Sequence, residues 1–365
     1  MEHWPLDGER RQKMKTIIMK NEERRMKNLF GHLLLSLLVM ASLAGCRKDL
    51  CYNHDEHSIS VKVDVVSEWE REWERPYDMD WQSTWDEQLM GRPYDDLRPE
   101  AADGIRALVY RDSELIAEHN LSAAVGRLPL NEGTFDLLFH NNDTEYVLID
   151  NSTTAAATRA TTRTVTRGGF MELHEGERTV NQPDMLYGHY LEDYVAERTP
   201  ESVGLPVLMH PLVYTYLIRY EFESGLEYVA LVRGALAGMA ESVYLSDGHT
   251  GDEAVTVMFD CGLTSWGTEA LVKSFGVPNY PGAHYTRADG TAATFAVSLD
   301  VRLYNGKIIT YDFDVTDQVE KQPRGGVITV SGIVVNKEDG EEGSGGFDVD
   351  VDGWGEYQDI PLPVE

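Results

Sequence analysis

Regular alternation of apolar and polar residues is the feature that most limits the folds open to this sequence. Between Ile59 and Val65, isoleucine or valine occupies every second position, and serine, lysine and aspartate lie between them. A period of two is typical of a β-strand with one buried face. Similar stretches return at roughly ten-residue spacing with turn residues between them, and this spacing predicts an all-β fold of the sandwich type.

The predicted strands form two groups. The first group covers 58–69, 104–112, 123–142 and 144–150, and the second covers 207–222, 226–248, 253–263, 293–316 and 325–335. Between the groups, residues 151–169 are small, polar and cationic, which predicts a linker or an exposed loop. Residues 170–204 read as a long excursion before the strands resume. Within the second group, 231–240 is rich in alanine, leucine and methionine and predicts a short helix or a crossover.

An insert follows the first strand and contains four tryptophans. It runs from residue 68 to residue 100 and is rich in loop-forming and charged residues. Exposed tryptophans would stack on sugar rings, whereas buried ones would cover an edge of the core, and the second interpretation is the more common for such residues. The four are Trp69, Trp73, Trp81 and Trp85.

The N-terminal part predicts export. Residues 33–44 are almost continuously apolar and follow basic residues, which is the pattern of a secretory signal peptide and too short to span a bilayer. The segment Leu43-Ala44-Gly45-Cys46 resembles the bacterial lipobox, so we expect cleavage between Gly45 and Cys46 and lipid attachment at Cys46. The mixed-charge residues before Met26 do not fit a signal, and we expect translation to start at Met26.

These patterns predict four segments. Residues 1–45 are the signal peptide with its upstream extension, and 46–57 are a polar, lipidated tether. Residues 58–170 and 171–365 are expected to form an N-terminal and a C-terminal β-sandwich domain. Lipid attachment predicts an outer-membrane protein, anchored by acyl chains at the cell surface.

The charge balance excludes one class of partner. The chain holds 62 acidic and 32 basic side chains, a formal net charge of −30. Such a field repels phosphate backbones, so we expect no nucleic-acid partner. Besides Cys46, the exported chain keeps two cysteines, Cys51 and Cys261. In an oxidising compartment these two either form a disulfide or remain unpaired thiols.

The sequence resembles a known group of proteins. The lipobox, the segments GIRALVYRD and LPLNEGTFDLLFHNND, and the segment LEYVALVRGALAGMAESVYLSDG are similar to those of fimbrillin-type pilins and pilus-anchor lipoproteins of Bacteroidetes. The resemblance implies two transthyretin-like β-sandwich domains and a role in building or anchoring fimbriae. In polymerising relatives, arginine-specific proteolysis releases a strand for exchange between subunits. Arg71 and Arg75 follow the first strand here, although nothing in the sequence marks either as a cleavage site.

The sequence shows none of three common catalytic motifs. The sequence contains no H-E-x-x-H, G-x-S-x-G or P-loop pattern, so we expect neither an enzyme nor a cofactor. The nearest match is an EF-hand-like spacing of Asp348, Asp350, Asp352 and Asp359. The alternating Phe347, Val349 and Val351 fit a strand with an acidic face equally well, so no metal is expected. The sequence therefore predicts a fimbrial anchor or accessory subunit that meets other subunits by strand donation, with a glycan-binding surface lipoprotein as the alternative.

Overall fold

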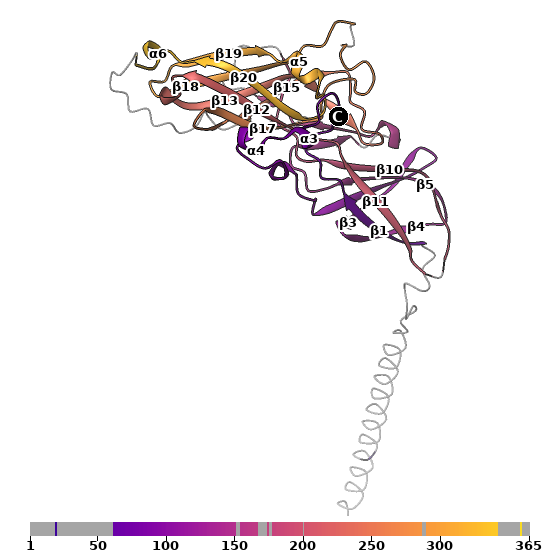
Figure 1. The fold of residues 1–365 in the computed structure, drawn as a ribbon. Helices are drawn as coiled ribbons and strands as arrows, with labels where there is room; N and C mark the ends of the chain where they lie inside the picture. The colour runs from indigo at the N-terminus through magenta and orange to yellow at the C-terminus, as the bar shows by residue number, and fades with distance from the viewer. Residues whose placement is uncertain are drawn as a thin grey trace, which may run out of the picture. The chain divides into compact units, whose positions relative to one another are not determined.

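The computed structural model describes residues 61–150, 154–166, 174, 177–199, 201–286, 290–341 and 358–359, with Met19 described alone near the N-terminus. Two compact units divide between Ile59 and Ser60, and every element discussed below belongs to the second unit. Strands dominate that unit and helices are limited to a few short turns, so the predicted all-β class is confirmed (Figure 1).

The first sheet has seven strands that come from separate parts of the chain. Its spatial order is β3 (Glu114–Ser122), β2 (Gly104–Arg111), β5 (Gly133–Asn141), β10 (Tyr187–Ala196), β11 (Val203–Pro211), β1 (Val61–Trp69) and β4 (Val125–Leu130). Only two residue pairs join β10 to β11, so the sheet bends there and its two parts face each other around one core. Ile105, Leu137, Phe139 and Tyr187 lie in that core and are fully buried.

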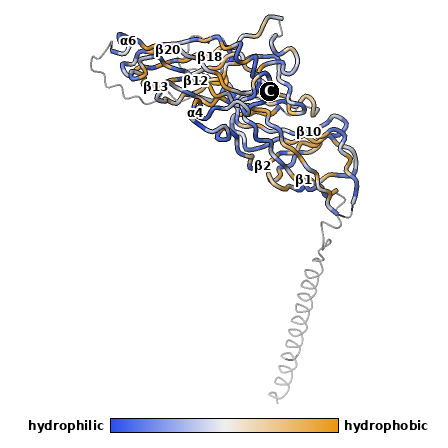
Figure 2. The backbone as a smooth tube through the Cα atoms, viewed as in Figure 1, coloured by the Kyte–Doolittle hydropathy of each residue, from blue (hydrophilic) through white to orange (hydrophobic). Residues whose placement is uncertain are grey.

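Two further sheets enclose a second core. One contains β16 (Gly262–Leu263), β17 (Gly267–Ser274), β12 (Tyr214–Ser224) and β20 (Gly326–Val334). The other contains β19 (Ile308–Asp314), β18 (Ala296–Leu303), β13 (Val229–Ala240), β15 (Ala254–Asp260) and β9 (Thr179–Val180). Apolar residues are concentrated within these strands (Figure 2).

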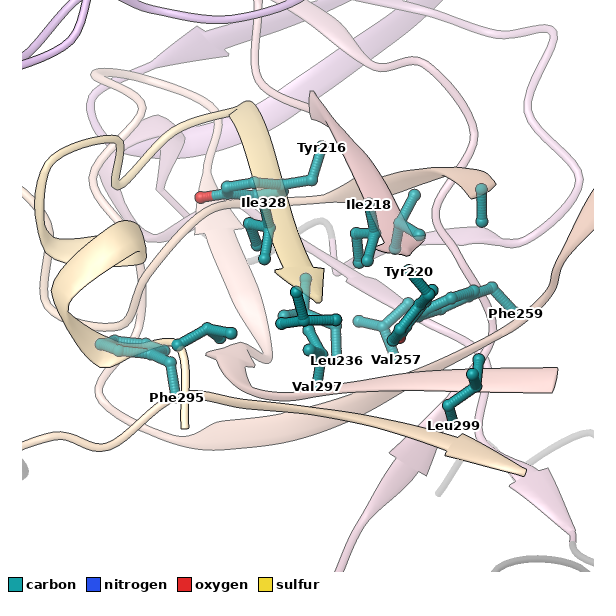
Figure 3. Close-up of a cluster of buried hydrophobic side chains, with 14 of the residues drawn as sticks. Tyr216, Ile218, Tyr220, Leu236, Val257, Phe259, Phe295, Val297, Leu299 and Ile328 are labelled. Carbon is teal, nitrogen blue, oxygen red and sulfur yellow. The ribbon is translucent and has the colours of Figure 1, made fainter. Parts of the chain in front are cut away.

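Side chains from the two sheets meet directly in the second core (Figure 3). Tyr216 and Ile218 of β12 and Ile328 of β20 point toward Leu236 of β13 and Val297 of β18. All five are fully buried, which is the arrangement expected when alternate residues of facing strands interdigitate.

A third cluster joins the strands of the first sheet to the later part of the chain. Leu108 and Tyr110 of β2 pack with Leu212, Val243 and other buried residues in one cluster. A three-stranded sheet of β6 (Val147–Asp150), β7 (Arg159–Thr162) and β14 (Ser242–Tyr244) contributes to it. Burial of this cluster couples early and late segments of the described chain.

That sheet corrects the expectation of a linker or exposed loop at 151–169. Ala160 and Thr162 of β7 are buried, and Thr158 is fully buried, where its hydroxyl lies 2.7 Å from the hydroxyl of Tyr110. Short side chains fit here because β7 packs closely against larger neighbours. A composition of small polar residues therefore concealed a strand. A two-residue strand, β8 (Val165–Thr166), follows and pairs with β21 (Gln358–Asp359).

Two other predictions were wrong. The excursion predicted at 170–204 contains β10, whose tyrosines and charged residues hide the apolar pattern. The helix or crossover predicted at 231–240 is a strand instead: these residues make up all but the first two of β13, which pairs with β15 and β18 on its two sides. Tertiary pairing overrides the helix propensity of alanine and methionine there.

The division into two domains at residue 170 stays a prediction. The pairing of β10 with β5 and of β11 with β1 places residues 187–211 in the first sheet. If two separable domains exist, that pairing assigns these residues to the N-terminal one.

Short helical segments complete the described chain. They are α3 (Trp81–Thr84), α4 (Glu87–Met90), η1 (Tyr94–Leu97), η2 (Ala155–Ala157), η4 (Leu226–Tyr228), α5 (Thr316–Glu320) and α6 (Lys337–Glu341). The first three lie in the tryptophan-containing insert, which is loop-rich as predicted.

A strand glycine supplies a test of the second core. A Cβ at Gly234 in β13 would stand 2.2 Å from the ring of Phe259, which is itself buried. We expect Gly234→Ala to lower the free energy of unfolding by about 1–3 kcal/mol, because the ring must shift in a packed core. Gly204→Ala is the matched control, since nothing lies within 4 Å of its Cβ position. Urea denaturation measures both, and equal shifts would contradict this account.

Candidate strand-exchange site

β1 is an inner strand although it is the first strand of the described chain. It runs parallel to β11 from Val63 to Trp69 and antiparallel to β4 from Val61 to Val66. Both of its edges are therefore occupied by backbone hydrogen bonds. Its removal would leave one unpaired edge on β4 and another on β11.

One face of β1 lies in the first core. Val61, Val63 and Val65 are 3%, 0% and 1% exposed, and they pack in the cluster that contains residues of β2, β5 and β11. Full burial of a valine side chain stabilises a fold by roughly 1.5–3 kcal/mol. These three side chains therefore supply much of the free energy that keeps β1 in place.

The opposite face of β1 is exposed and partly charged. Asp64 lies 3.3 Å from Nε of Arg127 on β4, and Val66 is 42% exposed. This alternation along one strand confirms the predicted half-buried strand at this position, although its described start is Val61.

A charged clamp follows the end of β1. The Glu70 N–H donates to the carbonyl of Met209, and the Glu70 carboxylate accepts two hydrogen bonds from Arg75 and lies 2.7 Å from Nδ1 of His210. Hydrogen bonding by Arg75 lowers the pKa of Glu70 to about 2. The stability this supplies is fully present above the unfolded pKa of 4.5 and is lost progressively as the pH falls from there through about 2, so Glu70 is ionised at any physiological pH.

The two arginines after β1 differ in their surroundings. Arg71 is exposed, and its Nε donates to the carbonyl of Pro99 at 2.5 Å. Arg75 is half-buried, paired with Glu70, and its N–H donates to the carbonyl of Arg324 at 2.8 Å. Arg71 is thus the more accessible of the two to an arginine-specific protease.

Residues 70–100, here called the strap, cross from β1 to the outer face of the sheet that holds β12 and β20. Trp73 is fully buried in a cluster with Met90, Leu217 of β12 and Val327 of β20. Its ring centroid lies 5.8 Å from that of Trp85. Arg92 forms an ion pair with Glu269 of β17, which fastens the strap to the same sheet.

The four tryptophans pack against protein. Trp81 and Trp85 are half-buried and donate their Nε1–H groups to Gln322 Oε1 at 2.7 Å and to the Arg92 carbonyl at 2.8 Å. Trp69 lies edge-on to Tyr187 with a centroid separation of 4.9 Å. They cover core edges and form no exposed platform on which sugar rings would stack, so glycan binding loses the feature that suggested it.

Glu74 is an unusual carboxyl group in the strap. It is 1% exposed, its Oε1 accepts a hydrogen bond from the Tyr94 hydroxyl at 3.0 Å, and its Oε2 has no hydrogen-bond partner. Burial raises its pKa to about 7, with smaller contributions from the negative charges of Asp80 and Glu72. No sequence pattern marks this group, because burial of one glutamate among many is a tertiary property.

One hydrogen-bonded chain resembles a hydrolase triad in its connectivity. Nε2 of His174 lies 2.7 Å from Oγ of Ser298, and Nδ1 lies 2.9 Å from Oε2 of Glu177. Ser298 is fully buried and His174 is 4% exposed, so the hydroxyl has no face open to a substrate. These hydrogen bonds instead join His174 and Glu177 to the outer face of β18.

Several predicted site residues lie outside the described residues. They are Gly45, Cys46, Cys51, Asp348, Asp350 and Asp352, and of Asp359 only the backbone is described, in β21. Cys261 forms no disulfide with a described residue, and the two alternatives for it, a disulfide with Cys51 or an unpaired thiol, both stay open. Burial raises the pKa of the Cys261 thiol, so it is a weak nucleophile as it stands.

Two other kinds of site are absent from the described part of the chain. No helix there is long and apolar enough to cross a bilayer. No group of three or more histidine, cysteine, aspartate or glutamate side chains there is arranged to hold a metal ion.

Comparison with known sequences gives a family model and a curated relative. Residues 96–260 match a family described as "Domain of unknown function (DUF5119)". The "Putative fimbrium anchoring subunit Fim4B" of Bacteroides ovatus is 22% identical over 366 residues, which is 91% of this chain and 97% of the relative. The resemblance to fimbrial anchor proteins is confirmed.

Solved structures agree with the fold. A crystal structure described as a putative adhesin from Bacteroides ovatus has a TM-score of 0.51 and 18% identity, over 80% of this chain and 98% of that chain. The fimbrial anchor protein Mfa2 from Porphyromonas gingivalis also matches, with a TM-score of 0.44 and 9% identity over 77% and 94% of the two chains. The shared architecture rests on the first of these two.

Glu74 predicts a pH dependence of stability. Its folded pKa is raised above the unfolded value, so ionisation opposes folding, and the free energy of unfolding should fall between pH 4.5 and pH 7 by up to about 3 kcal/mol and then level off. Glu74→Gln keeps an acceptor for Tyr94 and should stabilise the protein at pH 8 while flattening this dependence. Urea denaturation across pH 4–8 measures it.

Glu68→Gln on β1 is the control for that experiment, because Glu68 is exposed. It should reproduce the wild-type curve. A Glu74→Gln curve that also follows the wild type would show that the buried carboxyl does not control the pH dependence.

The insertion of β1 supplies a second prediction. We expect Val63→Asp to lower the free energy of unfolding by more than about 3 kcal/mol, because it places an unpaired carboxyl in the first core. Val66→Asp, three residues along the same strand but 42% exposed, should change it by less than about 1 kcal/mol. If thermal or urea unfolding finds the two variants alike, β1 is not inserted as described.

Proposed function

We propose that the protein is a non-catalytic, lipid-anchored cell-surface subunit that anchors a fimbria or serves as an accessory to its assembly. The observation that carries the proposal is the position of β1 between β4 and β11. An N-terminal strand in that position either completes the sheet of its own chain or vacates a site that a neighbour's strand fills. The relative named as a fimbrium anchoring subunit, which spans nearly the whole chain, supports this reading.

Strand exchange at this site is physically reasonable. A donated strand would gain hydrogen bonds along both β4 and β11 and would bury alternate side chains where Val61, Val63 and Val65 now lie. Cleavage after Arg71 would release β1 from the strap, which stays fastened through Trp73 and Arg92. A chain that keeps β1 accepts no strand there and ends or anchors the polymer.

Retention of β1 favours the anchoring role. β1 follows directly on the tether, so a lipid on Cys46 would be held to the fold only while β1 stays in its sheet. The clamp of Glu70, Arg75 and His210 and the three buried valines supply that hold. An outer-membrane, surface-exposed location follows as part of the proposal.

A structural role without catalysis is the reading that the relatives support. The buried position of Ser298 is consistent with it, because the triad-like chain of hydrogen bonds from Glu177 through His174 to Ser298 has no accessible nucleophile. Other fimbrial subunits are the proposed partners.

The experiment is deletion of the gene followed by complementation with the wild type or with Cys46→Ala. We expect the wild type to restore cell-attached fimbriae and to be labelled by an alkyne fatty acid. Cys46→Ala should lose the label and shed fimbriae into the medium, because the anchor is gone while the strands are intact. Electron microscopy of cells and medium reads the outcome. Unchanged attached fimbriae in the deletion strain would refute the anchoring role.

A further inference from the structure

The free edge of β20 is covered by side chains. β20 ends its sheet and pairs with β12 on one side. Alternate residues of a strand direct their backbone N–H and C=O groups to the same side of the strand. Val327 and Thr329 therefore both direct these groups away from β12, toward whatever lies along the outer edge. An edge left open there would be a template for another strand.

Two glutamines occupy these positions. Gln322 Oε1 accepts from the Val327 N–H at 3.0 Å, and its Nε2 donates to the Val327 carbonyl at 2.5 Å. Gln318 Oε1 accepts from the Thr329 N–H at 2.9 Å, and its Nε2 donates to the Thr329 carbonyl at 3.0 Å. The primary amide of a glutamine side chain is planar like a peptide group and carries a carbonyl acceptor beside an NH2 donor. Each glutamine therefore offers β20 the same hydrogen bonds that a residue of a neighbouring strand would offer.

The spacing of the two elements makes this match possible. Gln318 lies in α5, and Gln322 follows after Lys321, whose backbone is still helical. Four residues of helix rise about 6 Å, and two residues of strand rise about 6.6 Å. Glutamines one turn apart therefore meet backbone groups two residues apart.

The glutamines are held in position by packing. Val315 and Val319 fix α5 in the second core and are 1% and 0% exposed. Trp81 of the strap donates to Gln322 Oε1 at 2.7 Å. A Cβ at Gly326 would stand 2.1 Å from the same oxygen, so this close approach requires glycine.

The far end of the edge is covered as well. The Tyr311 hydroxyl of β19 donates to the carbonyl of Val334, the last residue of β20, at 2.8 Å. Side chains of α5, of Gln322 just after it and of β19 thus cover both ends of the edge.

We infer that Gln318 and Gln322 block strand addition at β20: they hold the backbone positions on β20 that the β20 strand of a second copy would use. The inference rests on the proposed function for its biological meaning, since it removes the β20 edge as a competitor of the β1 site for an added strand. The β20 edges of two copies would pair antiparallel about a two-fold axis. A second copy is therefore the partner that Gln318 and Gln322 exclude.

The test uses the full chain from Cys46 onward with Gln318→Ala and Gln322→Ala combined, studied by analytical ultracentrifugation. We expect the dissociation constant of its dimer to fall at least tenfold relative to the wild type. The control combines Gln82→Ala and Gln88→Ala, two exposed glutamines of α3 and α4, and should match the wild type. A folded double variant that dimerises no more than the control overturns the inference.

Adding Thr329→Pro to the double variant tests the route of dimerisation. Proline removes the outward N–H and is tolerated on an edge strand, so the variant should return to the wild-type dissociation constant. Dimerisation that survives this change overturns the inference, because the copies then do not meet at β20.

Gln318→Ala alone gives a readout that does not need association, and Gln318 is the less buried of the pair. Hydrogen exchange at the Thr329 amide should accelerate on the order of tenfold, whereas the Ile328 and Val330 amides keep their rates. Unchanged exchange at Thr329 overturns the inference. These measurements use purified protein without other subunits. They therefore test the role of the two glutamines independently, even if deletion of the gene leaves fimbriae attached and so refutes the anchoring role.

Discussion

The parallel pairing of β1 with β11 is the contact on which the first sheet depends. It brings Val63 beside Val203 and closes the core between β4 and the bend at β10 and β11. Few local contacts support it, so the chain between the two strands must already be folded for the pairing to be favourable. The strap begins where β1 ends, so the same strand also positions Trp73 and its neighbours on the second sandwich.

Charge and burial act together at the junction of β1 and the strap. Glu70 is ionised and bridges Arg75 and His210, whereas Glu74, four residues later, is buried with one oxygen unpartnered. The pKa values of these two carboxyl groups are shifted in opposite directions by an arginine and by desolvation. Two chemically similar residues thus have opposite effects on how firmly the strap is held as the pH changes.

Sequence patterns predicted strands where burial is one-sided and failed where packing decides. Alternation located β1, and β2 and β5 lie where strands were expected. It did not find β7, whose buried residues are small, or β10, whose aromatic and charged residues obscure the period. In β13, alanine and methionine suggested a helix, yet the segment is a strand whose Gly234 is required by the Phe259 ring of the neighbouring strand. No local pattern encodes that contact.

The candidate site was only partly predictable for the same reason. Residue order placed the first strand next to the tether and two arginines after it, but the inner position of β1 comes from pairing with residues about 140 positions away. The tryptophans were noticed as a group, whereas the choice between exposure and burial needed Leu217 and Val327 of distant strands. The glutamines beside β20 carry no signal in a sequence where such residues are usually solvated.

The order of residues along the chain also determines when β1 can pair during synthesis. A polypeptide is made from its N-terminus at about 5–20 residues per second, so Val203 is synthesised on the order of ten seconds after Val63. During the first part of that interval neither neighbour of β1 exists, and once Val125–Leu130 has been made β4 is the only one of the two. Every new copy therefore passes through a stage in which the earliest strand waits, half-paired and with apolar side chains uncovered, for its second partner to arrive.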